Sequence, residues 1–175
     1  MKIVEYDKYT AENLDKLVTN VVQLLVRRGI SVSTAESCTG GLLSELITAV
    51  PGASGIFELG ICTYSERMKN RFLDVSPETI EKYGVVSREV ALEMVRGLKK
   101  VSGADICISV TGIAGPGGGT AETPVGTVYI GFDIMGRQFA ELPELWKLND
   151  LGRSSIRRAA AAYIFETIEK ALMEA

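Results

Sequence analysis

A serine and a cysteine stand beside two glycines in the stretch STAESCTGGLLSEL, where an alternating apolar segment meets a helical pattern. Glycine lets the backbone approach a ligand closely, and free N–H groups at the start of a helix can hold an anion or an oxyanion. Ser37 at this junction is therefore a candidate nucleophile. The structural alternative is that Ser37 caps the helix while the glycines shape the turn.

The chain contains no histidine, which excludes Ser-His-Asp and Cys-His catalysis and removes the commonest metal ligand. Acid–base chemistry must therefore come from Lys, Tyr, Asp, Glu or Cys. Cys38 is an alternative nucleophile, because a thiol near a helix start can have a lowered pKa. It ranks second to Ser37, since cysteine is often a small packed apolar residue.

The segment TYSERMK places a tyrosine, Tyr64, five residues before a lysine, Lys69. This is not a same-face helical spacing, so their proximity depends on the turn between them. A lysine that is desolvated in a pocket has a lowered pKa and can act as a general base. The ordinary alternative is a lysine on the solvent-exposed surface.

A second glycine-bearing loop, TGIAGPGGGTAETP (111–124), follows the apolar run ADICISV. Loops at the carboxyl ends of strands are where open α/β folds bind ligands. The loop is not a P-loop, because no Lys-Ser or Lys-Thr follows its last glycine, and it leads to a strand, unlike the dinucleotide fingerprint. Two such loops favour a ligand site over a mobile surface loop.

Three arginines, Arg153, Arg157 and Arg158, lie in the first turns of the last predicted helix. Arg153 and Arg157 share a helical face and could together hold a phosphate. Basic residues at a helix start oppose the helix dipole, so stability does not explain them. We therefore favour an anion site over a solvated face.

Hydrophobic periodicity predicts helices that alternate with strands. The helices are expected over residues 11–28, 39–50, 66–73, 77–83 and 88–101, and from about 150 onward. The strands are expected over residues 30–36, 55–65, 104–110, 125–134 and 137–146, with the last two turning at Met135-Gly136. This order predicts an α/β fold over residues 1–175: a single layered domain with a mixed sheet flanked by helices.

Composition narrows the class of protein. The 175 residues are 46% hydrophobic and 23% charged, which is typical of a globular domain. A net charge of −3 argues against nucleic-acid binding, and no apolar run is long enough to span a membrane. The acidic start is not a signal peptide, and three scattered cysteines suit a reducing compartment and form no zinc motif. We expect a cytoplasmic protein without a bound metal.

The motifs TAESCTGG, GICTYSERMK, YGVVS and TGIAGPGGG…PVGTV, followed by the late arginines, resemble the CinA C-terminal domain family. Its characterised members are nicotinamide-nucleotide amidases. The resemblance runs from about residue 13 to residue 172 and points to the stand-alone form, without the preceding nucleotide-pyrophosphatase-like domain. It implies a small-molecule nucleotide as the binding partner, no cofactor, and a homo-oligomer.

The resemblance also implies a reaction: the carboxamide of nicotinamide mononucleotide is hydrolysed to nicotinate mononucleotide and ammonia. Ser37 would be the nucleophile, Lys69 would accept its proton, and Tyr64 would relay or orient. To this we add an oxyanion hole formed by the backbone N–H groups around Thr39, Gly40 and Gly41. The rival interpretations are a nucleotide-binding regulatory module without turnover and a phosphoryl-transfer enzyme, which would need a P-loop or a metal-carboxylate cluster.

The remaining site residues implied by the resemblance line the nucleotide site or face its phosphate. Those expected to line the site are Ser54, Thr111, Gly112 and Gly115, and those expected near the phosphate are Arg153 and Arg157. Relatives commonly carry Gly-Asp-Arg where this chain has Leu151-Gly152-Arg153, and Asn-Glu where it has Glu66-Arg67. We expect Arg67 to depress the pKa of Lys69 by like-charge repulsion.

Overall fold

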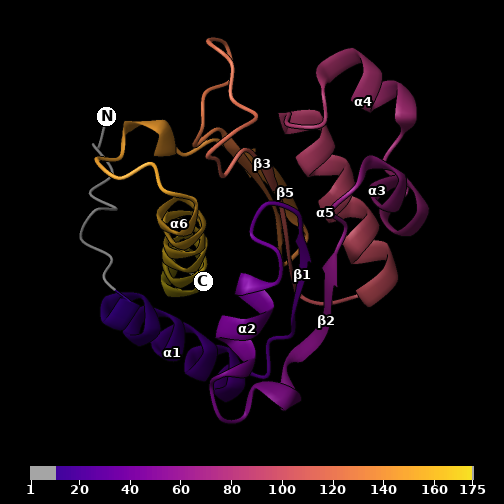
Figure 1. The fold of residues 1–175 in the computed structure, drawn as a ribbon. Helices are drawn as coiled ribbons and strands as arrows, with labels where there is room; N and C mark the ends of the chain where they lie inside the picture. Colours follow the sequence, from indigo (N-terminus) through magenta and orange to yellow (C-terminus); the bar gives the residue numbers. More distant parts are fainter. Residues whose placement is uncertain (1–10, 175) are drawn as a thin grey trace.

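The computed structural model describes residues 11–174, which form a mixed five-stranded sheet between two groups of helices (Figure 1). The strands are β1 (Val32–Glu36), β2 (Phe57–Cys62), β3 (Ile106–Gly112), β4 (Val128–Ile134) and β5 (Arg137–Glu141). Their order across the sheet is β2-β1-β3-β4-β5. Strand β1 runs parallel to β2 and β3, whereas β4 is antiparallel to β3 and β5. The predicted α/β fold with a mixed sheet is confirmed.

Helices cover both faces of this sheet. One face carries α1 (Ala11–Arg28), α2 (Leu42–Thr48) and α6 (Arg153–Glu174); the other carries α3 (Glu66–Leu73), α4 (Pro77–Tyr83) and α5 (Arg88–Ser102). Two short 3-10 turns, η2 (Ala53–Gly55) and η3 (Leu145–Lys147), complete the described elements. None of these helices combines the length and the apolar character needed to cross a lipid bilayer.

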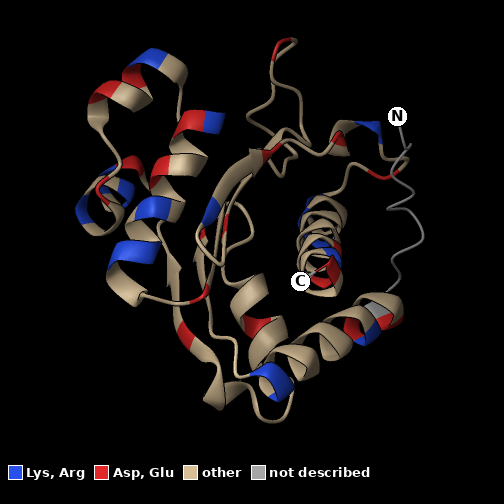
Figure 2. Cartoon of the chain, turned by 180° about the vertical axis from the view of Figure 1, so that it is seen from behind, with Lys and Arg blue, Asp and Glu red and all other residues tan. Residues whose placement is uncertain are grey.

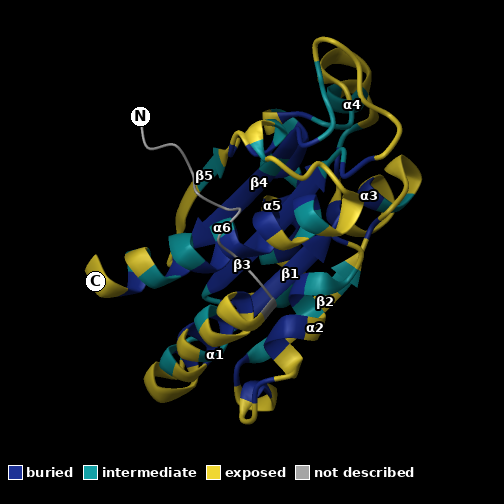
Figure 3. Cartoon of the chain, turned by 60° about the vertical axis from the view of Figure 1, so that its left-hand side comes forward, coloured by how far each residue is buried: buried dark blue, intermediate teal, exposed yellow. Residues whose placement is uncertain are grey.

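The core follows from alternation along the strands. In β3, Ile106, Ile108 and Val110 pack toward α1, α2 and α6, while Cys107 packs toward α5. Each fully buried aliphatic side chain contributes about 1.5–3 kcal/mol relative to an exposed one. Figure 3 shows β1, β3 and β4 as a buried centre, with exposed residues on the outer surfaces of the helices. Because β1, β2 and β3 run parallel, their carboxyl ends lie at the same edge of the sheet.

Local sequence explains where the helices begin and end. Ser87 caps α5 by accepting a hydrogen bond from the N–H of Val90, and Gly103 ends it in a left-handed conformation. Helix α2 begins at Leu42, three residues later than expected, because Gly40 and Gly41 have φ angles of 59° and 93°. Such angles cannot continue an α-helix. Residues 37–41 therefore form a turn and not the first helical turn.

Helix α3 owes its position to a close approach to α5. A Cβ atom on Gly97 would lie only 2.0 Å from the carbonyl oxygen of Leu73, so only glycine allows this contact. Lys69 lies one turn before Leu73 on the same helix. Figure 2 shows basic residues interspersed with acidic ones along α3, α4 and α5.

Candidate active site

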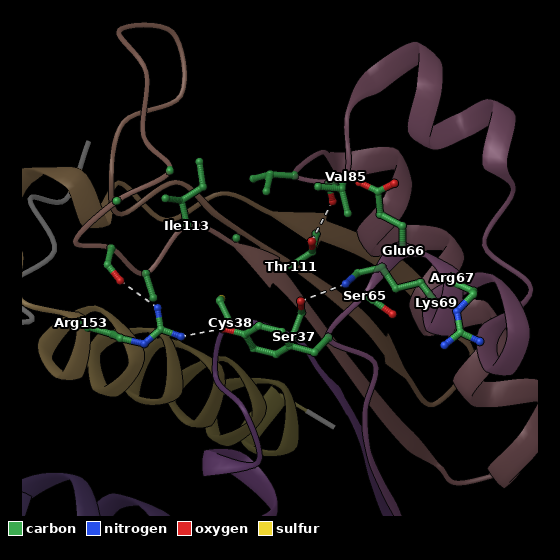
Figure 4. A pocket seen from close by; sticks show the side chains of 17 residues that line it. Ser37, Cys38, Ser65, Glu66, Arg67, Lys69, Val85, Thr111, Ile113 and Arg153 are labelled. Carbon is green, nitrogen blue, oxygen red and sulfur yellow. Dashed lines mark hydrogen bonds between the residues drawn. The ribbon is translucent and has the colours of Figure 1, made fainter.

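A cavity of about 630 Å³ opens at the carboxyl ends of β1, β2 and β3 (Figure 4). Its walls come from the end of β1, the connection from β2 to α3, the loop after β3 and the start of α6. The polar side chains that face it include Ser37, Tyr64, Lys69, Thr111 and Arg153. The topology thus joins the three motifs that the sequence singled out, although they are far apart along the chain.

Ser37 and Lys69 form the central contact of this cavity. The Nζ atom of Lys69 lies 2.9 Å from the Oγ atom of Ser37, and it donates to the carbonyl of Thr63 at 2.7 Å. Lys69 is 1% exposed and Ser37 is 9% exposed. Ser65 caps α3, so Lys69 lies in the first helical turn with its side chain directed at the end of β1.

Burial lowers the pKa of Lys69, while the charges of Cys38 and Glu66 oppose this shift. Among the described residues, no carboxylate forms an ion pair with Lys69. The shift has the expected direction, but its cause is burial and not repulsion by Arg67, which is exposed. A lowered pKa favours the neutral amine of a buried lysine, and the neutral amine is the form that can accept a proton from a serine.

Tyr64 contacts a different partner from the one expected. Its hydroxyl accepts a hydrogen bond at 2.8 Å from Arg153, which also donates to the carbonyl of Gly115 at 2.8 Å. Within residues 11–174, no hydrogen bond joins Tyr64 to Ser37 or Lys69. The ring is 62% exposed. Tyr64 therefore orients Arg153 and does not relay a proton between the other two residues in this structure.

The thiol of Cys38 has an environment unsuited to a nucleophile. Cys38 lines the cavity but is only 6% exposed, and burial raises its pKa to about 11. Such a thiol is almost entirely protonated near neutral pH, whereas the thiolate is the reactive form. The expectation of a lowered thiol pKa is wrong, because desolvation outweighs the nearby positive charges.

Glu36, next to Ser37, is a buried charged residue that the sequence analysis did not single out. Its fully buried carboxylate accepts hydrogen bonds from the N–H groups of Gly41 (3.0 Å), Leu43 (3.1 Å) and Ser44 (3.0 Å), and from the Ser44 hydroxyl (2.9 Å). The N–H of Gly40 bonds the carbonyl of Ser37 at 3.0 Å. A charged residue at the end of an apolar strand was the available signal, because a buried carboxylate requires donors.

These bonds correct the predicted oxyanion hole. The N–H groups of Gly40 and Gly41 already have acceptors, so neither can hold a developing oxyanion without breaking a bond. Thr39 is fully buried and does not line the cavity with its side chain. The backbone N–H group of Cys38, which lines the cavity, remains as a candidate donor.

Arg153 and Arg157 lie in different surroundings. Only Arg153 lines the cavity, whereas Nε of Arg157 donates to the carbonyl of Thr39 at 3.0 Å and braces the turn after Ser37. The prediction that Arg157 holds a phosphate is therefore not supported by its position. Ser54 also lies elsewhere: it is exposed in η2, before the amino end of β2, at the opposite edge of the sheet.

The loop after β3 is placed as expected. Thr111 and Gly112, at the end of β3, line the cavity, and Gly115, Gly117 and Gly118 of the loop that follows line it too. The Thr111 hydroxyl donates to the carbonyl of Val85 at 2.8 Å, which joins the end of β3 to the segment before α5. The loop therefore forms one wall of the cavity.

A family model for the CinA C-terminal domain matches residues 14–172. The chain belongs to the CinA C-terminal domain family. A CinA-like protein from Thermotoga sp. (strain RQ2) is 45% identical over 161 residues, which cover 91% of this chain and 38% of that protein. The chain thus spans about two fifths of the length of such curated relatives.

Solved structures of CinA proteins share this fold. The competence/damage inducible protein CihA from Agrobacterium tumefaciens is 38% identical, with a TM-score of 0.84 over 91% of this chain and 94% of that one. A CinA superfamily protein from Klebsiella pneumoniae is 30% identical, with a TM-score of 0.85 over 93% of this chain and 99% of that one. The resemblance proposed from the motifs is confirmed at the level of the family and the fold.

The donor set of this CinA domain bears on what it could hold. Across residues 11–174, the Cys, Asp and Glu side chains form no group of three placed to bind a metal ion. The cavity instead offers an arginine, a serine, a lysine and the backbone of a glycine-rich loop. These groups suit an anionic organic molecule.

Proposed function

We propose that this chain is an amidohydrolase that cleaves the carboxamide of nicotinamide mononucleotide to give nicotinate mononucleotide and ammonia. One observation carries the chemistry: Lys69, buried and without an ion pair among the described residues, lies 2.9 Å from the Ser37 hydroxyl oxygen. The resemblance to nicotinamide-nucleotide amidases supports the substrate. The cavity volume, about 630 Å³, is within the range of small-molecule sites.

In the first half of the reaction, Ser37 gives its hydroxyl proton to the neutral Nζ of Lys69 while Oγ attacks the carboxamide carbon. The carbonyl oxygen becomes negatively charged, and the N–H group of Cys38 is our candidate to stabilise it. Lys69 then passes the proton to the amide nitrogen as the C–N bond breaks. Ammonia leaves, and Ser37 carries the acyl group as an ester.

In the second half, water attacks the ester carbon while Lys69 accepts one of its protons. The bond between Oγ and the acyl carbon breaks, and Ser37 takes the proton back from Lys69. The product's new carboxylic acid loses the second proton of the water to the solvent, nicotinate mononucleotide leaves with a carboxylate, and Lys69 is neutral again. One lysine thus serves both halves, which is the role that histidine fills in other serine hydrolases.

The binding end of the cavity lies across from Lys69, where Arg153 and the glycine-rich loop face the opening (Figure 4). The Arg153 guanidinium presents fixed N–H donors that suit a phosphate. Two hydrogen bonds hold the Arg153 side chain, one to the Tyr64 hydroxyl and one to the Gly115 carbonyl. We place the phosphate here and the carboxamide at Ser37.

The test is ammonia release from nicotinamide mononucleotide by the purified chain, with a metal chelator present. We expect release that saturates with substrate and that falls at least about 1,000-fold in Ser37→Ala, while the nucleotide still binds by calorimetry. Ser54→Ala is the matched control, because that serine is exposed and lies outside the cavity.

Two outcomes would refute parts of the proposal. Full activity in Ser37→Ala would remove this serine as the nucleophile. Saturable binding without ammonia release in the wild-type chain would instead favour a nucleotide-binding regulatory module.

A further inference from the structure

Glu36 and Ser37 are neighbours in sequence, but their side chains point in opposite directions at the end of β1. The Glu36 carboxylate points into the start of α2, where it is fully buried, while Ser37 points into the cavity toward Lys69. Between them and α2 lie Gly40 and Gly41, both in the left-handed conformation. The turn that carries Ser37 is thus tied back onto the residue that precedes it.

The bonds of Glu36 are more numerous than capping of a short helix requires. Its two oxygens accept from three backbone N–H groups and the Ser44 hydroxyl at 2.9 to 3.1 Å, and from the Thr34 hydroxyl at 3.5 Å. A buried carboxylate is costly to remove from water, and charge-assisted hydrogen bonds of this kind offset that cost. Because most of these bonds come from residues 41–44, they fix the path of the chain on both sides of the turn.

We infer that Glu36 is a positioning residue for the Ser37 nucleophile. By holding the N–H groups of Gly41, Leu43 and Ser44, its carboxylate fixes the turn at residues 37–41, so that the Ser37 Oγ atom stays within hydrogen-bond reach of Lys69. This role in catalysis rests on the proposed function. The contact between Ser37 and Lys69 is a property of the structure, and its effect on the reactivity of Ser37 can be measured without any substrate.

The bonding pattern predicts what a substitution would do. In Glu36→Gln the side chain keeps its shape, but one oxygen becomes an NH₂ group that faces backbone N–H donors on either side. Because two donors cannot hydrogen-bond to each other, the backbone bonds that the replaced oxygen accepted are lost, and the turn is held less tightly. A displacement of about 1 Å at a reacting atom can cost about 100-fold in rate.

The experiment measures how fast a fluorophosphonate probe labels Ser37, by intact-protein mass spectrometry with peptide mapping. We expect Glu36→Gln to label about 30- to 100-fold more slowly than wild type. Ser44→Ala, which removes one hydroxyl donor to Glu36, should label about threefold more slowly. Glu45→Gln makes the same chemical change on an exposed residue of the same helix, so it should label at the wild-type rate.

Two further readouts separate positioning from a purely structural role. The pH dependence of labelling should keep its wild-type midpoint in Glu36→Gln, because Lys69 still activates the serine. Amide hydrogen exchange should accelerate in residues 37–44 of this variant and stay unchanged in α5. For ammonia release, kcat should fall with labelling while KM changes less than about threefold.

A folded Glu36→Gln chain that labels at the wild-type rate would overturn the inference. If that variant does not fold, Ser44→Ala decides, and labelling of Ser44→Ala at the wild-type rate would overturn it equally. A wild-type chain that labels at Ser37 but releases no ammonia from nicotinamide mononucleotide would contradict the proposed function alone. In that case the labelling rates of the variants still test Glu36.

Discussion

Lys69 Nζ lies 2.9 Å from Ser37 Oγ, although the two residues are 32 positions apart and belong to α3 and the end of β1. The contact exists because β1 and β2 are parallel, so the chain leaving β2 enters α3 at the edge where Ser37 lies. The close approach at Gly97 then holds α3 against α5. A strand register and a helix contact together place Lys69 beside Ser37.

The pH dependence of the reaction should report the state of Lys69. Because burial lowers the pKa of Lys69 below its ordinary value of 10.5, kcat should rise with pH and level off below 10.5. Lys69→Met should lose most of the rate, and its residual activity should lack this rise. Steady-state ammonia release across pH measures both, and a wild-type kcat that is independent of pH would assign the base elsewhere.

Lys69 should also make stability depend on pH in a defined direction. Between its folded pKa and 10.5, the unfolded chain binds a proton that the folded chain does not, so this residue's contribution to stability rises with pH. Below that window both states are protonated, and the folded state bears the full penalty of a buried charge. The Tm of wild type minus that of Lys69→Met should therefore increase as pH rises toward 10.5.

Calorimetric melting of both chains at several pH values measures this difference. Lys170→Met, at an exposed lysine, is the control and should give a difference that does not change over the same range. A wild-type advantage that shrinks with rising pH would contradict the sign derived from burial.

Tyr64→Phe should separate the relay role from the orienting role. The Tyr64 hydroxyl bonds Arg153, so its loss should loosen Arg153 and raise KM about three- to tenfold, with kcat reduced less than about fivefold. A relay would show the reverse pattern, in which kcat falls steeply at constant KM. Initial rates over a range of substrate concentrations distinguish the two.

Arg153→Ala should act on the phosphate end of the substrate. Loss of a charge-assisted contact should lower kcat/KM for nicotinamide mononucleotide about 10- to 100-fold. The same variant should lose little toward nicotinamide riboside, which has no phosphate. Arg158→Ala, at an exposed position on the same helix, is the control. An equal loss on both substrates would remove Arg153 from the phosphate site.

Much of the fold was predictable because the signals are local. The apolar spacing and the Ser87 cap predicted α5 to within one residue at its C-terminus, and Met135-Gly136 marked the turn between β4 and β5. Strand alternation separated the two faces of the sheet. The start of α2 was predicted too early, because a helical pattern does not reveal that two glycines adopt left-handed angles to serve a buried carboxylate.

The candidate site was predictable in part, and the errors share a cause. Ser37, Lys69, Thr111 and Arg153 meet at the cavity, whereas Ser54 lies at the other edge of the sheet. Arg153 and Arg157 have equivalent positions in the helical pattern, yet one faces the cavity and the other braces the Thr39 carbonyl. Side chains of one type are distinguished only by what the fold places opposite them.

The sequence by itself determined that no histidine of this chain takes part in its chemistry, and its motifs marked Ser37, Lys69, the glycine-bearing loop and Arg153 as candidates for one site. The tertiary structure decided that Lys69 lies buried beside Ser37 and that the Glu36 carboxylate bonds the turn that follows it. A pKa depends on burial and neighbouring charge, and a hydrogen bond depends on distances of a few ångströms between distant segments. Neither quantity is set by the identity of a residue until the chain has folded around it.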